Sequence, residues 1–287
     1  MGNPPVIVIT GATNGLGRLA ALELARRGAH LGIVGRSPDK MAELRSEIDG
    51  VAPGTAVDSF TADLTRMGDV RRAASDIAAT YEGIDVLINN AGVHAFSQRI
   101  TRDGFSEMVA VNYLAPWLLT TGLLGKLVAS SPARIITVAS GAAGHARGID
   151  PAEDLANTAD YTRRESGILY GRTKLMDMMF SLELGRRLAG TGVTVNCCCP
   201  GFNTTGLGRD LPFAGTLERI LTALHVGDPR RGAGIIVRLA TDPALTVSAD
   251  GYYSVKSDRP LDCPEYGRSP EIQAELWKAT ADVLDQR

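Results

Sequence analysis

Tyr170 and Lys174 are two side chains whose types and spacing could perform proton transfer together. The sequence around them has helical spacing, and residues four apart lie on the same face of a helix. A free tyrosine has a pKa of about 10, too high for efficient proton exchange at neutral pH, but a nearby ammonium group favours the phenolate. The pair is therefore a candidate acid–base site. Taken alone, such a pair is more often an ordinary feature of a helix surface.

A glycine-rich segment near the start of the chain has the residue types that bind phosphate. It reads TGATNGLG from Thr10 to Gly17, directly after an apolar, β-branched run and directly before a helical pattern. Glycines permit a tight turn and close approach of the backbone to a ligand, and a helix N-terminus attracts anions. Strand, loop and helix in this order predict a dinucleotide site. The residues expected at the cofactor are Gly11, Thr13, Asn14, Gly15, Leu16 and Gly17.

The end of the second predicted strand indicates which dinucleotide is bound. Dinucleotide folds usually carry an acidic residue there, which binds the ribose 2′-hydroxyl. This chain has Gly35 and Arg36 instead. Arginine can pair with a 2′-phosphate, and the missing carboxylate removes a repelling charge, so the sequence predicts NADP(H) rather than NAD(H). The alternative is that Arg36 is an exposed residue at a strand end.

The pattern of apolar residues predicts a scaffold of alternating strands and helices for these sites. Strands are expected at residues 6–10, 30–35, 56–61, 84–89, 134–139, 193–199 and 251–255, and helices at 16–27, 38–48, 67–81, 104–129, 169–188 and 270–284. Alternation of this kind implies a parallel sheet covered on both faces, with ligands beyond the carboxyl ends of the strands. We expect an α/β single-domain Rossmann fold over residues 1–287, with a doubly wound parallel sheet of about seven strands.

Two long segments interrupt the alternation on the side where ligands are expected. Residues 141–167 form a predicted insertion before the Tyr170 helix, and residues 202–229, rich in Gly, Pro and Thr, form a predicted substrate loop. The candidate apolar walls are Phe96, Phe202 and Phe213, and the histidines that could touch substrate are His94 and His145. Each of these could also be ordinary surface.

The overall composition excludes several classes of function. The chain is 44% hydrophobic, and its 30 Lys+Arg against 32 Asp+Glu give a formal net charge of -2, so nucleic acid is not an expected partner. No signal region or membrane-length apolar run is evident, so we expect a cytoplasmic protein without a membrane anchor. Cys197, Cys198 and Cys199 would alternate between the two faces of a strand and cannot converge on one ion, so no metal site is expected.

Several motifs together resemble the short-chain dehydrogenase/reductase family, from about residue 6 to residue 255. They are Thr10 to Gly17 for Thr-Gly-x-x-x-Gly-x-Gly, Asp63-Leu64 for the adenine-contacting Asp-Leu, Asn89-Asn90-Ala91-Gly92 for Asn-Asn-Ala-Gly, and Tyr170 with Lys174 for Tyr-x-x-x-Lys. The resemblance implies cofactor contacts from Asp63, Leu64, Asn90, Ala91, Gly92, Tyr170 and Lys174. Pro200 and Gly201 resemble the family's turn beside the nicotinamide, with Thr205 in the place of its threonine, whereas Asn203 replaces the usual aliphatic residue.

The same resemblance implies a catalytic set of Asn112, Ser140, Tyr170 and Lys174. Ser140 and Tyr170 would hydrogen-bond the substrate oxygen while hydride moves between the nicotinamide and the carbonyl carbon, and Tyr170 would donate or accept the proton. Lys174 would bind the nicotinamide ribose and lower the tyrosine pKa, and Asn112 would hold a water that links Lys174 to solvent. Ala139 stands where many relatives have a second serine.

The long interval between Ser140 and Tyr170 resembles the retinol-dehydrogenase, carbonyl-reductase and protochlorophyllide-reductase-like branch. Members of that branch often act on bulky apolar ketones, aldehydes or alcohols, so a substrate of this kind is expected. The insertion can block helix pairing between subunits, which favours a monomer or homodimer over a tetramer. The alternatives are reduction of an activated C=C bond or a cofactor-assisted rearrangement or cyclisation at the same site, and, in another class, a non-catalytic NADP-binding regulator.

Overall fold

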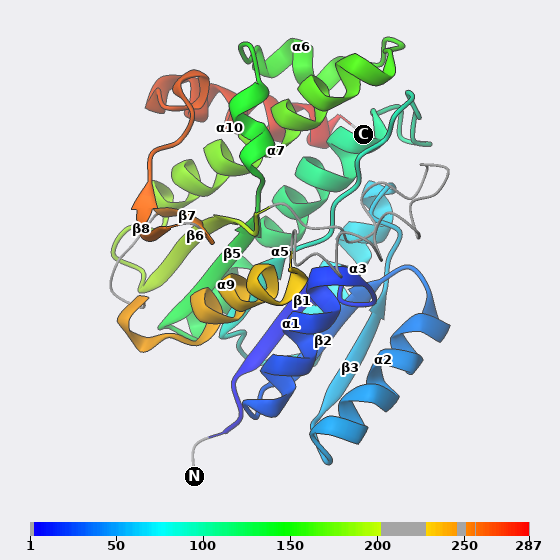
Figure 1. Ribbon diagram of the computed structural model, residues 1–287, viewed down its shortest axis with the longest axis vertical. Coiled ribbons are helices and arrows are strands. Elements are labelled where there is room, and N and C mark those ends of the chain that lie inside the picture. The colour runs from blue at the N-terminus through cyan, green and yellow to red at the C-terminus, as the bar shows by residue number, and fades with distance from the viewer. Residues whose placement is uncertain (1–2, 202–227, 246–250, 256, 287) are drawn as a thin grey trace.

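The computed structural model describes residues 3–201, 228–245, 251–255 and 257–286. They form an α/β domain in which helices cover both faces of an 8-stranded sheet (Figure 1). The strand order is β3-β2-β1-β4-β5-β6-β7-β8. The strands are β1 (Val6–Thr10), β2 (His30–Gly35), β3 (Val57–Thr61), β4 (Val86–Asn89), β5 (Ala133–Val138), β6 (Val193–Cys199), β7 (Gly251–Ser254) and β8 (Ser257–Leu261).

Strands β1 to β7 are parallel, and the order of the strands reverses between β1 and β4. β1 pairs with β2 on one side and with β4 on the other. In a doubly wound sheet such a reversal opens a crevice at the carboxyl ends of the two strands. The residues that follow β1 and β4 are the glycine-rich loop and Asn90-Ala91-Gly92. The topology therefore brings these two motifs, which are far apart in the sequence, to one crevice.

Two groups of helices bury their apolar residues against opposite faces of the sheet. One group consists of α1 (Gly15–Arg26), α2 (Pro38–Val51) and α9 (Pro229–Thr241). The other consists of α3 (Met67–Thr80), α5 (Ala115–Ala129) and α7 (Arg163–Arg187), with α10 (Pro270–Asp285) packed against α7. The Trp277 ring of α10 also lies 5.4 Å from the Trp117 ring of α5. Helix α10 therefore covers part of the surface of both α5 and α7.

The predicted fold class and its seven strands are confirmed, and among the α-helices and strands of the described residues β8, α6 and α9 were not predicted. β8 pairs antiparallel with β7 at the edge of the sheet and contains Pro260, which weakens the sequence signal of a strand. α6 (Pro151–Ala156) is too short to show helical periodicity. α9 begins at Pro229, where the Asp228 side chain accepts a hydrogen bond of 2.9 Å from Arg230 N.

The predicted insertion at 141–167 is folded and partly helical. It contains a 3-10 turn, η2 (Gly141–His145), then α6, and finally the first turn of α7, which begins earlier than the sequence predicted. The reason is a capping box at Thr162: Glu165 Oε2 accepts a hydrogen bond of 2.7 Å from Thr162 N, and Thr162 Oγ1 accepts one from Glu165 N. Of the predicted substrate loop at 202–229, residues 202–227 lie outside the described residues.

One helical stretch in the described ranges is long and apolar enough to cross a membrane. It runs from Glu107 to Ala129, and 78% of the residues in its most apolar 18-residue segment are buried inside the domain. The stretch consists of α4 (Glu107–Val109), a π-helical segment η1 (Ala110–Leu114) and α5. Its apolar side chains pack against the sheet and neighbouring helices, so it is a core helix. The sequence analysis predicted a helix at 104–129 but did not expect an apolar run of membrane length.

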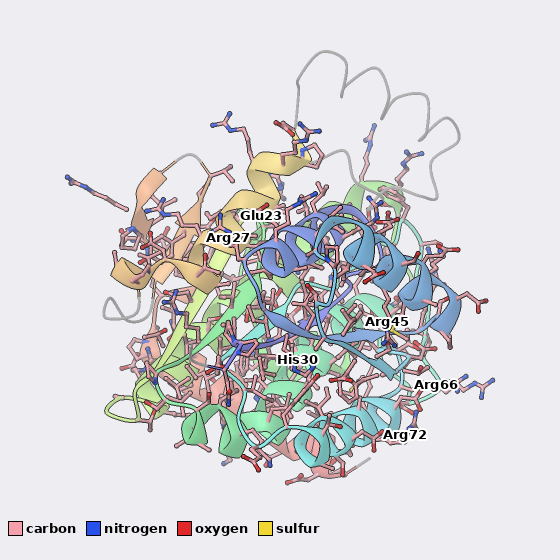
Figure 2. All side chains as sticks on the ribbon, turned by 90° about the horizontal axis from the view of Figure 1, so that it is seen from below. Glu23, Arg27, His30, Arg45, Arg66 and Arg72 are labelled. Atoms are coloured by element: carbon pink, nitrogen blue, oxygen red, sulfur yellow. The ribbon has the colours of Figure 1, made fainter. Side chains whose placement is uncertain are left out.

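Charged side chains cover the outer surface of the helices near β1 to β3 (Figure 2). Several basic groups lie beside acidic groups of the same helix. Arg27 Nε is 3.0 Å from Glu23 Oε1 next to α1, and an Arg72 guanidinium nitrogen is 3.1 Å from Asp69 Oδ1 on α3. Exposed pairs of this kind add little stability, but they neutralise positive charge locally.

Candidate active site

The glycine-rich loop is held in a conformation that only glycine accommodates at two positions. Gly11 has a φ of 68°, and its N–H donates to Val34 O at 3.3 Å, which ties the loop to β2. A Cβ on Gly17 would lie 2.4 Å from both Gly11 O and Asn90 Nδ2. Asn14 is the N-cap residue of α1, but its side chain accepts no hydrogen bond from the helix. The first N–H groups of α1 therefore have no side-chain cap and remain available to a ligand in the crevice. A phosphate fits this arrangement.

Gly17→Ala is expected to lower the free energy of unfolding by about 1–3 kcal/mol, because the added methyl group overlaps backbone that cannot move freely. Cofactor binding should weaken with it. The matched control is Gly234→Ala in α9, where an added Cβ meets nothing within 4 Å, so no stability should be lost. Denaturant unfolding measures the free energy of unfolding of both variants, and NADPH titration measures their cofactor affinity. Equal stability and equal affinity in the two variants would contradict the close approach at Gly17.

Asn90 and Thr10 tie the end of β4 to the end of β1. Thr10 Oγ1 accepts hydrogen bonds of 3.0 Å from Asn90 N and from Ala91 N. Asn90 Nδ2 in turn donates to Thr10 O at 2.9 Å and to Gly11 O at 3.3 Å. Gly92 follows, and a Cβ there would lie 3.4 Å from Asn112 Oδ1 and 3.5 Å from Lys174 Nζ. The Asn-Asn-Ala-Gly segment therefore joins the phosphate loop to the catalytic candidates.

A cleft of about 410 Å³, open to solvent, runs along the carboxyl ends of the strands. Its lining includes most of the sequence-predicted site residues: Gly11, Thr13, Asn14, Gly15, Leu16, Gly17, Arg36, Asp63, Leu64, Asn90, Ala91, Gly92, Ser140, Tyr170, Lys174, Pro200 and Gly201. Asn112 is not in the lining but lies directly behind it. Asn203 and Thr205 lie outside the described residues. A glycine cradle, a helix N-terminus and a long cleft together fit a dinucleotide.

The cleft also contains residues that the sequence did not single out. Val93, Ala95, Arg99, Glu107 and Val111 are among them. Val93 directly follows the Asn-Asn-Ala-Gly motif and Ala95 lies two residues further on, and this nearness to the motif was the sequence signal for them. An Arg99 guanidinium nitrogen lies 3.3 Å from Glu107 Oε2, so the lining of the cleft also carries an ion pair.

Arg36 is exposed at the mouth of the cleft, directly after β2. Arg18, the other basic residue near the loop, forms an ion pair with Glu47. The positive charge of Arg18 is therefore already matched by a carboxylate. Asp63 uses its Oδ1 to accept hydrogen bonds from Thr65 N at 3.0 Å and Thr65 Oγ1 at 2.7 Å, which fixes the turn after β3.

Tyr170, Ser140 and Lys174 meet where β5 ends and α7 passes over it. Ser140 follows β5 and its Oγ accepts a hydrogen bond of 3.2 Å from Ala142 N, which starts the turn η2. Lys174 Nζ donates to Val138 O of β5 at 2.9 Å and to Asp177 Oδ2 of α7 at 2.9 Å. The predicted four-residue spacing of Tyr170 and Lys174 places both side chains in the cleft.

Tyr170 is nearly fully buried, and its surroundings pull its pKa in opposite directions. Burial is the largest cause and raises the pKa above the ordinary value of tyrosine. The ammonium of Lys174 lowers the pKa, the carboxylate of Asp177 raises it, and a hydrogen bond with Ser140 lowers it. The net direction is upward, so Tyr170 is a neutral phenol at neutral pH. A phenol in this position can donate a proton to a substrate oxygen.

Asn112 lies in the π-helical segment η1, a type of irregularity common at functional sites. Its Oδ1 accepts from Val93 N at 2.7 Å, and its Nδ2 donates to Val93 O at 2.9 Å and to Thr173 Oγ1 at 3.0 Å. Thr173 Oγ1 also donates to Tyr170 O at 2.8 Å. The Asn112 side chain therefore fixes both a wall of the cleft and the helix that carries Tyr170.

His94 lies against the ring of Tyr170. The two rings are stacked, with centroids 4.7 Å apart and an angle of 17° between their planes. The Phe96 ring centroid lies 4.6 Å from that of His94, and the Arg163 guanidinium is 5.0 Å from the centroid of the Phe96 ring. Burial lowers the pKa of His94, so the imidazole is neutral at neutral pH. Of the histidines and phenylalanines considered from the sequence, His94 is thus in direct contact with Tyr170.

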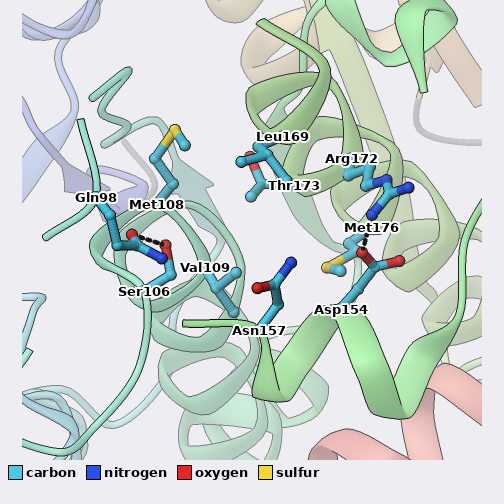
Figure 3. Close-up of a pocket in the computed structure, with 10 residues that line it drawn as sticks. All are labelled: Gln98, Ser106, Met108, Val109, Asp154, Asn157, Leu169, Arg172, Thr173 and Met176. Atoms are coloured by element: carbon cyan, nitrogen blue, oxygen red, sulfur yellow. Dashed lines mark hydrogen bonds and ion pairs between the residues drawn. The ribbon is translucent and has the colours of Figure 1, made fainter. Parts of the chain in front are cut away.

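A second, much smaller cavity of about 20 Å³ lies on the side of α7 that faces the insertion (Figure 3). Helix α6 closes it, and an ion pair of 2.7 Å joins Asp154 of α6 to Arg172 of α7. Thr173, which bonds to Asn112, also borders this cavity. The insertion therefore braces the helix that carries Tyr170 and Lys174.

Comparison with known proteins identifies the family. A family model described as short chain dehydrogenase matches residues 5–150. The chain belongs to the short-chain dehydrogenase family. Retinol dehydrogenase 13 of Homo sapiens is 36% identical to it, over 97% of this chain and 84% of its own length. A protein of Streptomyces sp. (strain C5) described as a daunorubicin C-13 ketoreductase is also 36% identical, over 97% of this chain and 92% of its own.

Solved structures agree with this assignment. A protein of uncharacterised function from Mycobacterium paratuberculosis has a TM-score of 0.77 at 27% identity and covers 98% of this chain and 95% of its own. A gluconate 5-dehydrogenase from Beutenbergia cavernae, with bound NADP, has a TM-score of 0.65 at 28% identity, over 88% of this chain and 94% of its own. The resemblance to the retinol-dehydrogenase branch is confirmed. This short-chain dehydrogenase is a nicotinamide-dependent oxidoreductase of carbonyl and alcohol groups.

Proposed function

We propose that this short-chain dehydrogenase is an NADPH-dependent reductase of bulky, apolar ketones or aldehydes. The observation that carries the proposal is the buried phenol of Tyr170, hydrogen-bonded to Ser140 and close to the Lys174 ammonium, at one end of the cofactor cleft. Because burial keeps the phenol protonated, Tyr170 is ready to donate a proton, which is what carbonyl reduction requires. The same site can run in reverse with an alcohol.

The preference for NADP(H) rests on Arg36. Its guanidinium is exposed at the cleft beside the loop that follows β2, where the adenosine ribose of a dinucleotide lies in this type of fold. A 2′-phosphate there would form a charge-assisted pair with Arg36. Bound NADP in the gluconate 5-dehydrogenase, at 28% identity, is consistent with this proposal.

Each residue of the proposed catalytic set has a separate role in the reaction. NADPH, when bound in the cleft, would supply a hydride to the carbonyl carbon. Ser140 and Tyr170 hydrogen-bond the carbonyl oxygen and orient it, and Tyr170 donates the phenolic proton to that oxygen as negative charge develops on it. Lys174 stabilises the resulting phenolate and binds the nicotinamide ribose, and Asn112 holds a water through which the proton is replaced. These roles are proposed for the cofactor-loaded enzyme.

The substrate class follows from the relatives and from the wall of the cleft. The relatives are named for retinol, an apolar alcohol, and for a ketone group of daunorubicin, a bulky molecule. Val93, Ala95 and Val111 line the cleft with apolar surface, the His94 ring stacks on Tyr170, and the Phe96 ring lies beside His94. Such a wall favours a flat apolar group next to the reacting carbonyl.

We also propose that the protein is a cytoplasmic monomer or homodimer, acting on a small molecule and not on nucleic acid. Helix α10 covers surface of α5 and α7, and the Trp277 ring lies 5.4 Å from Trp117 and 5.8 Å from Phe180. That coverage removes helix surface that could otherwise pair with other subunits. The four cysteines are free, which suits a reducing compartment. Light scattering of the purified protein tests the oligomeric state, and a tetramer would contradict the proposal.

The decisive experiment is an NADPH-oxidation assay of the purified protein with bulky ketones, aldehydes, quinones and enones, with NADH in parallel. Turnover of ketones or aldehydes, with the alcohol identified as product, supports the proposed reaction. Turnover confined to enones with a saturated ketone as product would instead assign C=C reduction. An isomeric product without NADPH consumption would assign a rearrangement, and NADPH binding without any turnover would favour a regulatory role.

A further inference from the structure

A buried carboxylate lies one helical turn beyond Lys174, and the proposed chemistry does not use it. The Asp177 side chain is fully buried on α7, with Oδ2 2.9 Å from Lys174 Nζ. Its other oxygen, Oδ1, is also buried and has no hydrogen-bond partner among the described residues. A buried charge with an unsatisfied oxygen costs free energy unless a cation compensates it. The one ion pair that the structure shows for Asp177 is with the catalytic lysine.

Hydrogen bonds to the protein hold the Lys174 ammonium in place at the cleft. An ammonium has three N–H donors. Two are used by Val138 O and Asp177 Oδ2, both at 2.9 Å, on the protein side. Lys174 also lines the cleft, so the remaining donor is available to groups in the cleft. Asp177 therefore contributes to fixing the direction in which Lys174 acts.

The charge state of Lys174 depends on Asp177. Burial is the largest influence and by itself lowers the pKa of Lys174, but the Asp177 carboxylate raises it, and the net direction is upward. The other titratable groups that face this pair are Tyr113 of η1, Cys197 and Cys198 of β6, and Tyr170 of α7. Burial raises the pKa of each of these four groups, so they are neutral at neutral pH. Burial also raises the pKa of Asp177, to about 6, so at neutral pH Asp177 is the anion that faces Lys174 from these elements.

We propose that Asp177 is a positioning residue that keeps the Lys174 ammonium charged and directed into the cleft, and that through Lys174 it sets the pH range of proton transfer by Tyr170. This inference rests on the proposed function, because it needs Lys174 to act on Tyr170. Asp177 does not touch substrate in this scheme. The opposing possibility is that its carboxylate only fills space inside α7 and its neighbours.

The test follows the charge of Lys174 directly by nuclear magnetic resonance. The chain has only five lysines, so 13C-labelled lysine gives few signals, and the Lys174 signal is the one missing from Lys174→Met. Asp177→Asn keeps the shape of the side chain and removes its charge. The control is Asp154→Asn, which removes a carboxylate from another largely buried ion pair, 2.7 Å from Arg172 and away from Lys174.

In the unaltered protein, Lys174 is expected to stay protonated beyond the pH at which an ordinary lysine loses its proton, because the Asp177 carboxylate offsets the effect of burial and raises the pKa of Lys174. In Asp177→Asn the midpoint of the Lys174 titration should fall by about one pH unit or more, because the buried ammonium of Lys174 then lacks its counter-ion. Asp154→Asn should leave the midpoint unchanged. An unchanged midpoint in Asp177→Asn would overturn the proposal.

Kinetics provide a second readout that separates this inference from the proposed function. The alkaline limb of the kcat profile should move to lower pH in Asp177→Asn, with the KM for substrate little changed. If the unaltered protein reduces no carbonyl compound, the proposed function fails, but the shift in the Lys174 titration still supports the role of Asp177. If carbonyl reduction is observed and neither the titration nor the pH profile moves, only the assignment of Asp177 fails.

If Asp177→Asn does not fold, a double variant tests the proposal instead. Lys174→Met/Asp177→Asn removes both members of the pair, so no uncompensated charge is left in the core. Recovery of cooperative thermal unfolding in the double variant supports a charge role for Asp177. Failure of the double variant to fold would show that the carboxylate serves packing and would overturn the proposal.

Discussion

Tyr170→Phe is expected to reduce kcat for carbonyl reduction by about 10² or more while NADPH binding is retained. The change keeps the ring that stacks on His94 at 4.7 Å and removes only the hydroxyl group that donates the proton. Without it, the oxygen of the substrate must take a proton from water, and the hydrogen bond that orients the carbonyl is lost. Steady-state kinetics and a separate NADPH titration measure the two effects.

The matched control is Tyr266→Phe, which removes a phenolic hydroxyl from an exposed residue outside the cleft. Its kcat should equal that of the unaltered protein. Activity that persists at full strength in Tyr170→Phe would show that another group supplies the proton. Loss of both activity and NADPH binding would instead indicate that the ring no longer packs correctly.

Arg36→Asp is expected to weaken NADPH binding by about 10 to 10² fold and to leave NADH binding nearly unchanged. A hydrogen bond to a charged group contributes about 1.5–3 kcal/mol, and each 1.4 kcal/mol corresponds to a tenfold change in affinity. The new carboxylate also repels the 2′-phosphate and can accept a hydrogen bond from the 2′-hydroxyl of NADH. Calorimetric titration with each cofactor measures the two dissociation constants.

Arg45→Asp makes the same change of charge on the exposed side of α2, outside the lining of the cleft. It separates a local contact from the general effect of a more negative protein, and it should alter neither dissociation constant appreciably. Equal weakening of NADPH and NADH in Arg36→Asp would contradict a contact with the 2′-phosphate.

Local patterns in the sequence were sufficient to predict the strands and the two best-defined motifs. Alternating or β-branched apolar runs reveal strands, and a spacing of four reveals which residues share a helix face. These rules predicted the seven parallel strands and placed Tyr170 and Lys174 together. They failed where the signal was short or weak, as at α6, at β8 with its Pro260, and at the capping box that starts α7 at Arg163.

The sequence by itself therefore determined the type of fold, the phosphate loop and the identity of the candidate acid–base pair. Only the tertiary structure decided the environment of that pair. Asn112 bonds to the backbone of Val93, His94 stacks on Tyr170, and Asp177 is buried against Lys174. The sequence shows that Lys174 and Asp177 are three residues apart, but it does not show that the two side chains form a buried ion pair. An exposed ion pair is screened by water, whereas the same pair in the core controls which groups are charged, and burial is a property of the packed chain.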